Sequence, residues 1–212
     1  EPLAVAIHAV AQAGEVAGQS VLIAGCGPIG LLTKIAAREA GADRIVMTDI
    51  LANRRSVAET LGATGALDPT AENWQEALAD AIGTEEVDVA FDAVGIAPTF
   101  NQTLDTVKPG GVVIALGGWL TVPVPLPRIV SKEIQVRGTF NFTVDEFKQA
   151  RQWLSEQRFD PTALVTCEPT AERGRDLVHF NRQRIAEVKS AVTASISCSF
   201  CSIFSTAGME IL

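Results

Sequence analysis

A glycine-rich run near the start of the chain has the residue types and spacing of a phosphate-binding loop. The run GCGPIG, residues 25–30, directly follows the apolar run SVLIA and precedes a helical pattern. In such a loop Gly25 allows a tight turn out of the strand, and Gly27, which has no Cβ, lets a pyrophosphate approach the backbone. Gly30 lets the helix pack closely against the sheet. The loop predicts a dinucleotide site, and the alternative is a plain strand-to-helix turn.

The first residues of the helix that follows this loop offer a second means of binding phosphate. The predicted helix begins at Ile29, directly after Pro28. The free N–H groups and the positive dipole end of a helix start favour bound phosphate. We therefore expect Pro28, Ile29 and Gly30 to lie beside the phosphates.

A carboxylate stands where the sugar of such a dinucleotide would bind. Asp49 ends the second strand-like run, nineteen residues after Gly30. At that spacing a carboxylate accepts hydrogen bonds from the ribose hydroxyls, and its charge repels a 2′-phosphate. This favours NAD over NADP, although Arg54 and Arg55 are close enough in sequence to hold that phosphate. The alternative role of Asp49 is to cap the helix predicted over residues 52–61.

Two later strand-like runs also lead into glycines. Val94 and Gly95 follow the fourth run, and Leu116 and Gly117 end the fifth. Ligands of open α/β sheets lie at the carboxyl ends of the strands, where small residues would let the ribose and nicotinamide approach the backbone. Ordinary turn chemistry is the alternative at each loop.

The elements that must position these loops alternate along the chain. Short β-branched runs predict strands over residues 20–24, 44–48, 65–68, 87–92, 111–116 and 134–138. Longer patterns predict helices over residues 2–13, 29–40, 52–61, 73–82, 97–106 and 144–156, with a helical turn over 127–131. A helix over 171–181 and a strand over 188–192 have weaker patterns. This alternation predicts an α/β fold: a doubly wound, parallel, six-stranded sheet of Rossmann type in the order 3-2-1-4-5-6.

Composition disfavours several classes of protein. The chain has 212 residues, 47% of them hydrophobic and 20% charged, as in ordinary globular proteins. Its net charge of −8 disfavours nucleic acid or an anionic membrane as a partner, because both require basic surfaces. Four cysteines are too few for a disulfide scaffold, and we find no signal-peptide pattern, so we expect a cytoplasmic protein. Glycines or alternating polar residues break the uncharged runs 109–127 and 190–209, so neither predicts a membrane span.

In their combination and order, the motifs resemble the cofactor-binding half of the zinc-dependent medium-chain dehydrogenases, in the sorbitol (polyol) dehydrogenase group. The matching stretches are EPLAV and IHA within residues 1–9, GCGPIG, Asp49 with Arg54, KPGG at 108–111, KEI at 132–134 and GTF at 138–140. Within the group, EPLAVAIHAV and KEIQVRGTFNFTVDEF most resemble the L-idonate 5-dehydrogenases, which oxidise a sugar acid to its 5-keto form.

The resemblance implies a mechanism and roles for particular residues. Zinc binds the substrate hydroxyl and lowers its pKa, and hydride moves from carbon to the nicotinamide of NAD. The glutamate of the family's EPL motif lies beside this zinc, as a ligand or as a partner of the bound water, which assigns Glu1 to the catalytic and metal site. Thr139 and Phe140 would contact the nicotinamide through their backbone. The next residue at this end of the cofactor site, Asn141, departs from the family, because the polyol group usually has an arginine there.

The resemblance also implies that this chain is one half of a longer enzyme. We expect a linker helix from a preceding catalytic domain over residues 1–14, an NAD-binding Rossmann domain over 15–158, a segment returning to the catalytic domain over 159–192, and an atypical tail over 193–212. The flanking pieces would be remnants of the second domain, which would supply most zinc ligands. His8 is expected to pack rather than to bind metal. By analogy, the region of the sixth strand would form a homo-oligomer.

The expected function is NAD-dependent oxidation of a secondary alcohol in a small-molecule polyol or sugar acid. This chain would supply mainly the cofactor-binding half and would be inactive alone. Two alternatives remain open: a module that binds dinucleotide without chemistry, and a zinc-free quinone or enoyl reductase. Glu1, and Asp49 with Arg54, argue against the reductase.

Overall fold

The computed structural model describes residues 1–118 and 121–164, which all fall within one unit, Glu1–Val165. The predicted helix over 171–181, the predicted strand over 188–192 and the tail over 193–212 lie outside these residues. The domain boundaries expected above therefore remain predictions.

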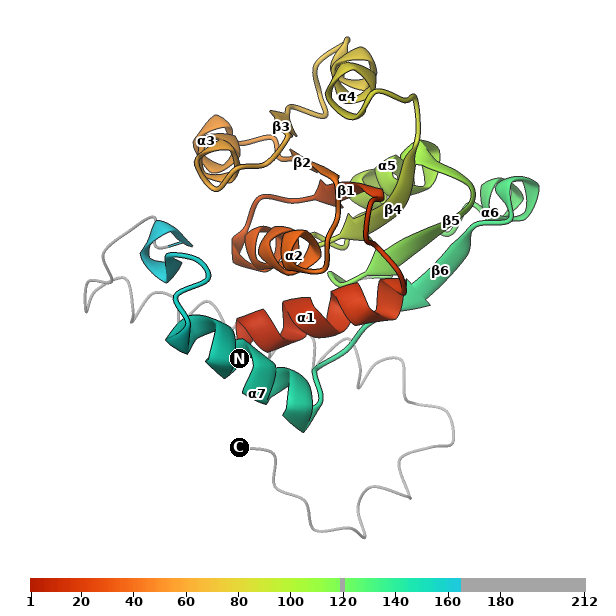
Figure 1. The fold of residues 1–212 in the computed structure, drawn as a ribbon. Helices are drawn as coiled ribbons and strands as arrows, with labels where there is room; N and C mark the ends of the chain where they lie inside the picture. Colours follow the sequence, from red (N-terminus) through yellow and green to blue (C-terminus); the bar gives the residue numbers. More distant parts are fainter. Residues whose placement is uncertain (119–120, 165–212) are drawn as a thin grey trace, which may run out of the picture. The chain divides into compact units, whose positions relative to one another are not determined.

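Within the described residues, six parallel strands form one sheet in the order β3-β2-β1-β4-β5-β6 (Figure 1). The strands are β1 (Ser20–Ala24), β2 (Arg44–Thr48), β3 (Gly65–Leu67), β4 (Val87–Asp92), β5 (Val107–Ala115) and β6 (Gln135–Gly138). In the centre, Val21 of β1 pairs with Ile45 of β2 on one side and Val89 of β4 on the other. The predicted doubly wound topology and strand order are confirmed.

Helices connect the strands and cover both faces of the sheet (Figure 1). They are α1 (Pro2–Ala13), α2 (Pro28–Glu39), α3 (Ala52–Thr60), α4 (Trp74–Ile82), α5 (Ala97–Thr106), α6 (Leu126–Lys132) and α7 (Val144–Ser155), with a final 3₁₀ turn over Pro161–Leu164. The ends of the predicted helices shift by at most one residue, and α1 and α5 have the predicted bounds.

The clearest difference from prediction is at β5, which begins at Val107 rather than at residue 111. Its pairing with β4 is irregular there, because Val87 pairs with Val107 whereas Val89 pairs with Val112. The composition of Lys-Pro-Gly-Gly, residues 108–111, suggests a turn. In the structure these residues form a bulge within β5. The sequence pattern missed Val107 because this residue pairs with Val87 of β4 on the far side of the bulge, which local sequence does not reveal.

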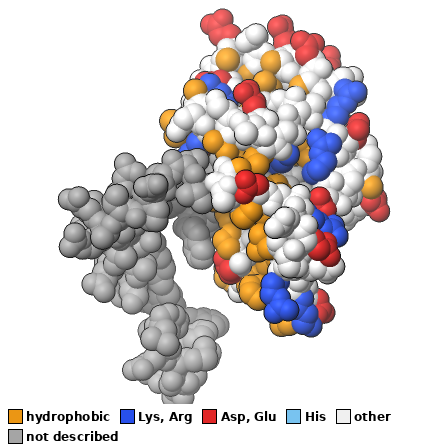
Figure 2. Space-filling view, turned by 60° about the vertical axis from the view of Figure 1, so that its left-hand side comes forward, with side chains coloured by type: hydrophobic (Ala, Val, Ile, Leu, Met, Phe, Trp, Pro, Cys, Tyr) orange, Lys and Arg blue, Asp and Glu red, His pale blue; other side chains and the backbone are white. Residues whose placement is uncertain are grey.

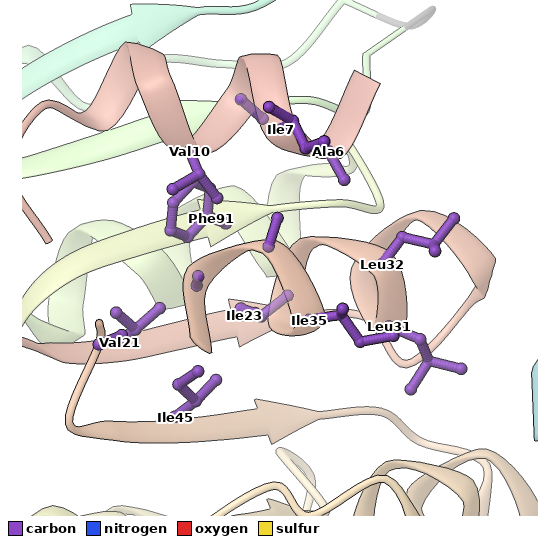
Figure 3. Packing of buried hydrophobic residues seen from close by; sticks show 14 of the residues in the cluster. Ala6, Ile7, Val10, Val21, Ile23, Leu31, Leu32, Ile35, Ile45 and Phe91 are labelled. Atoms are coloured by element: carbon purple, nitrogen blue, oxygen red, sulfur yellow. The ribbon is translucent and has the colours of Figure 1, made fainter. Parts of the chain in front are cut away.

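Two apolar layers hold the sheet, one on each face. Val21 and Ile23 pack with α1, α2 and α7 in one layer, whereas Leu22 packs with α4 and α5 in the other, as the alternation of side chains along a strand requires. Figure 3 shows the first layer, in which Val10 of α1 lies over Phe91 of β4. These layers fix α2 against β1 and thus the loop that joins them.

Polar contacts fix the position of α1, the helix that begins at Glu1. The Nη1 group of Arg137 on β6 donates to the carbonyl oxygen of Gln12 at 2.7 Å. Near the middle of the helix, Nδ1 of His8 lies 2.9 Å from Oε1 of Glu146 on α7. In Figure 3 the strand arrows point in the direction from Val10 toward Ala6, so the N-terminus of α1 faces the carboxyl edge of the sheet.

The surface carries both signs of charge. Figure 2 shows one face, on which basic and acidic side chains are interspersed with hydrophobic ones. Among the helices of the described ranges, none is both long enough and apolar enough to cross a bilayer.

Candidate functional site

The loop between β1 and α2 depends on glycine at its first and last positions. Gly25 has φ +103°, and its N–H donates to the carbonyl oxygen of Thr48 at 2.7 Å, which ties the end of β1 to the end of β2. A Cβ on Gly30 would lie 1.9 Å from the carbonyl oxygen of Gly25. Gly25 therefore makes the tight turn that the motif predicted, and Gly30 has no room for a side chain beside the backbone of Gly25.

Gly27 differs from these two, because it faces open space. A Cβ built on it would meet no other atom within 4 Å, and its backbone is extended at φ −75°. It is the N-cap residue of α2, which begins at Pro28, and no side chain of the described residues caps this helix. The first N–H groups of α2 thus remain available beside an open cradle, which fits a diphosphate.

Asp49 lies beside this cradle and is only 9% exposed. Its Oδ2 accepts from the N–H of Cys26 at 3.0 Å, and its Oδ1 accepts from the N–H of Leu51 at 2.9 Å. A carboxylate has about four lone-pair sites, so two such bonds leave acceptor capacity for a ligand. The N-cap residue of α3 is Leu51, so Asp49 does not occupy the capping position that was its alternative role.

The two arginines that follow Asp49 have different surroundings. Arg55 donates through Nη1 to the backbone oxygen of Asp49 at 2.7 Å and lies 3.1 Å from Oδ2 of Asp68 on the next strand end. Arg54 is half exposed, with Nη1 3.6 Å from Oδ2 of Asp49. Arg55 is therefore held in the fold, whereas Arg54 can turn toward a ligand.

Cys26 contributes its backbone rather than its thiol. Burial, and then the charge of Asp49, raise the pKa of the thiol to about 12. The thiol is therefore neutral and unreactive near pH 7, because the thiolate is the reactive form.

The loops after β4 and β5 pack against each other. Asp92 ends β4, and its Oδ1 accepts from the N–H groups of Val94 at 3.1 Å and Gly95 at 2.9 Å. A Cβ on Gly95 would lie 2.2 Å from the backbone carbon of Gly117. Close backbone packing thus requires glycine here, and the contact of Val94, Gly95, Leu116 and Gly117 with a cofactor remains a prediction.

The segment after β6 reaches the same edge of the sheet. The N–H of Thr139 donates to the carbonyl oxygen of Ala115 at 3.1 Å, while its buried Oγ1 has no partner among the described residues. Phe140 is 76% exposed, and Asn141 has the left-handed φ of +64°. These three residues thus follow β6 at the edge of the sheet where the glycine loops after β4 and β5 also lie.

A cavity of about 160 Å³ lies next to Asp49, between the ends of β1, β2 and β4. The sequence analysis did not identify most of its lining, which is Gly25, Thr48, Asp49, Ile50, Arg54, Pro69, Val94, Ile96, Thr99 and Gln102. Scattered single residues of this kind have no motif. Gln102 gives no local signal either, because other buried positions of the same helix, Thr103 and Thr106, are also polar.

A larger, open hollow of about 800 Å³ lies at the opposite edge, where the strands begin. Its Asp88 accepts from the N–H and hydroxyl of Ser20, each at 2.7 Å, and pairs with Lys108. These groups already satisfy one another, and ligands of doubly wound sheets bind at the other edge. The size of this hollow therefore does not make it the candidate site.

The expected zinc ligand Glu1 is exposed at the start of α1, with its backbone oxygen accepting from Ala4. Within residues 1–118 and 121–164, no three His, Cys, Asp or Glu side chains gather in a way that could hold a metal ion. The described residues therefore do not form a zinc site. His8 is largely buried, as expected, but it also pairs with Glu146 rather than making apolar contacts alone.

The fold and the loop at its carboxyl edge are those of the Rossmann-type dinucleotide-binding domains. The sequence pattern of the family described as zinc-binding dehydrogenase matches residues 28–156. The chain therefore belongs to the zinc-binding dehydrogenases, in the polyol group of the medium-chain family that its motifs resemble.

Several relatives support this assignment. L-idonate 5-dehydrogenase (NAD(P)(+)) of Escherichia coli is 36% identical over 79% of this chain and 48% of its own length. Sorbitol dehydrogenase of Bos taurus is 32% identical over 78% of this chain and 47% of its own length. The crystal structure of a zinc-binding dehydrogenase from Sinorhizobium meliloti bound to NADP has a TM-score of 0.71 and 33% identity, covering 78% of this chain and 50% of that one. The chain spans about half the length of the curated relatives it matches.

Proposed function

We propose that this chain binds a nicotinamide dinucleotide at the carboxyl edge of its sheet, for the oxidation of a secondary alcohol in a polyol or sugar acid. One observation carries the proposal. The open Gly27 lies before the uncapped start of α2, next to a buried carboxylate, Asp49, with spare acceptor sites. The names of the relatives supply the substrate class, since they include L-idonate 5-dehydrogenase and sorbitol dehydrogenase.

Each part of the dinucleotide has a counterpart at this edge. The N–H groups at the start of α2 and the open Gly27 take the diphosphate. Asp49 accepts from the hydroxyls of the adenosine ribose, and the cavity beside it takes the base. The ends of β5 and β6, with Leu116 and Thr139, lie along the nicotinamide half. When bound, the nicotinamide accepts the hydride, and the chain's own groups hold it in place.

At the substrate end of the site, this chain contributes only a few residues to the proposal. Glu1 would supply one group beside zinc, and no three side chains of the described residues gather to hold that metal by themselves. Asn141 replaces the arginine usual in the polyol group and leaves a neutral side chain near the substrate. Self-association through β6, which is an edge strand, also remains a proposal.

NAD is the proposed cofactor, because the buried charge of Asp49 opposes a 2′-phosphate. Arg54 offsets this in part, since it is half exposed and within reach of the same ribose. One relative is named for both cofactors and one solved relative was bound to NADP, so the preference depends on these two side chains.

The first prediction tests this preference by calorimetry of the 212-residue chain with NAD and NADP. NAD should bind more tightly. Asp49→Asn should reduce the ratio of NAD affinity to NADP affinity about tenfold, which corresponds to about 1.4 kcal/mol. The reason is that asparagine lacks the negative charge but keeps an acceptor oxygen. Arg54→Ala is the matched variant, and it should weaken NADP binding more than NAD binding.

Two outcomes would count against the proposal. If a folded sample binds neither dinucleotide, the cofactor site is wrong. If the full-length protein forms no NADH with idonate, sorbitol or xylitol while the chain binds NAD, the alternative of a dinucleotide-binding module without this activity is favoured instead.

A further inference from the structure

A buried glutamine beside the cavity has an amide group that the fold does not satisfy. Gln102 is on α5 and only 8% exposed. Its Oε1 accepts from the hydroxyl of Thr48 at 3.3 Å, and its Nε2 has no hydrogen-bond partner among the described residues. Buried donors without partners are rare in folded proteins, and each needs an explanation. A ligand in the neighbouring cavity would provide one.

The lining of the cavity defines the chemistry of that ligand. Its walls include the aliphatic side chains of Ile50, Val94 and Ile96 together with Pro69. Such walls suit the two faces of a flat heteroaromatic ring. The charged groups, Asp49 and Arg54, belong to the side where the ribose is expected.

Gln102 supplies a donor at this cavity, and that restricts the ring further. Thr48 occupies Oε1, which leaves the Nε2 hydrogens for a ligand. On a heteroaromatic ring, an N–H donor pairs with an unprotonated ring nitrogen or with a carbonyl oxygen, and adenine has no carbonyl oxygen. The ring nitrogens of adenine provide such acceptors.

We propose that Gln102 is a specificity-determining residue for the base, donating a hydrogen bond from Nε2 to a ring nitrogen of adenine in this cavity. The inference rests on the proposed function, because it places the adenosine half of the dinucleotide beside Asp49. It goes further by assigning recognition of the base to one side chain outside every motif in the sequence.

The test is calorimetry of the chain with AMP and with deaza analogues in which N1, N3 or N7 is replaced by CH. At least one analogue should bind the wild-type chain about tenfold more weakly than AMP, as expected for the loss of one hydrogen bond. Gln102→Leu should bind AMP about as weakly as the wild-type chain binds that analogue. The variant should also bind AMP and the analogue equally, because the side chain that donates to the ring nitrogen is gone.

A matched variant controls for changes in packing. Thr103→Val removes another buried polar group from α5, at a residue that is fully buried and does not line the cavity. It should leave the binding of AMP and of every analogue unchanged. Thermal unfolding of both variants checks that each is folded.

The outcomes separate this inference from the proposed function. Equal binding of AMP and all three analogues to the wild-type chain, or a penalty that persists in Gln102→Leu, overturns the role of Gln102 alone. If the folded wild-type chain binds neither AMP nor NAD, the proposed function is overturned, and this inference with it.

Discussion

Three glycines of one motif do different physical work in the β1–α2 loop. Gly25 adopts a φ of +103° and turns the chain out of β1. Gly30 leaves no room for a side chain, because its hydrogen faces the carbonyl oxygen of Gly25. Gly27 is constrained by neither conformation nor neighbours, so its lack of a side chain is useful only to something outside the chain.

The residue-scale prediction compares alanine at two of these positions. Gly27→Ala should leave the free energy of unfolding within about 0.5 kcal/mol of the wild type but weaken NAD binding about tenfold, since the methyl group would occupy the path of the diphosphate. Gly30→Ala should lower the free energy of unfolding by about 3 kcal/mol, because the methyl group would clash with backbone. Urea unfolding and calorimetry measure both effects.

Gly30→Ala is the internal control for this comparison. Loss of stability in Gly27→Ala, or undiminished NAD binding by it, would contradict the view that the space before α2 is kept for a ligand.

At the scale of elements, carboxylates at strand ends and helix starts hold the site together. Asp49 ties the phosphate loop to the end of β2, and Asp92 orders the β4–α5 loop by accepting from two N–H groups. Glu146 joins α7 to α1 by accepting from the Thr143 N–H at 2.6 Å and pairing with His8. Each of these carboxylates therefore fixes a loop or helix to a neighbouring part of the chain.

The pH dependence of Asp92 is the first prediction at this scale. Burial is the largest influence on its pKa and raises it above the ordinary value of 3.8, although the N–H groups of Gly95 and Val94 act in the opposite direction. A raised pKa means that the folded state binds the proton more tightly, so Asp92 contributes stability at low pH that is lost as pH rises through its folded pKa. Asp92→Asn keeps an acceptor for both N–H groups without the charge.

We therefore expect the free energy of unfolding of Asp92→Asn to increase relative to that of the wild type as pH rises from about 3.8. Urea unfolding at several pH values measures the difference. A difference that stays constant, or that shrinks toward neutral pH, would contradict the assigned direction of the shift.

Glu146 should show the opposite dependence. Burial alone raises its pKa, but the hydrogen bonds from Thr143 and His8 outweigh burial and hold the pKa below its ordinary value of 4.5. Its stabilising contribution is then present above pH 4.5 and lost as pH falls through the folded pKa. Glu146→Gln should lower the free energy of unfolding by about 1 kcal/mol at neutral pH and have little effect in acid. Equal effects at both pH values would disprove this.

At the scale of the whole molecule, the two edges of the sheet are not equivalent. The carboxyl edge gathers the glycine loops, Asp49, Thr139 and the cavity with Gln102, and two polar atoms there, Gln102 Nε2 and Thr139 Oγ1, are buried without partners in the described residues. The amino edge has the larger hollow, but Asp88, Ser20 and Lys108 satisfy one another within it. Unsatisfied polar groups, rather than size, therefore distinguish the candidate site.

The sequence by itself determined the topology and the phosphate loop of this protein. Strand and helix periods, with right-handed crossovers, favour the strand order that the structure has, and the spacing from GCGPIG to Asp49 is local enough to be seen along the chain. The sequence misplaced the start of β5, because Val107 pairs with β4 across a bulge that local patterns do not reveal.

Only the tertiary structure decided how side chains from separate elements meet. It brought Gln102 of α5 and Thr48 of β2 to one cavity, and it bound Arg55 to Asp68 while leaving Arg54 half exposed. It also paired His8 with Glu146, 138 residues later. None of these contacts follows from periodicity or a motif, because each depends on how the helices pack on the sheet once the apolar layers have formed.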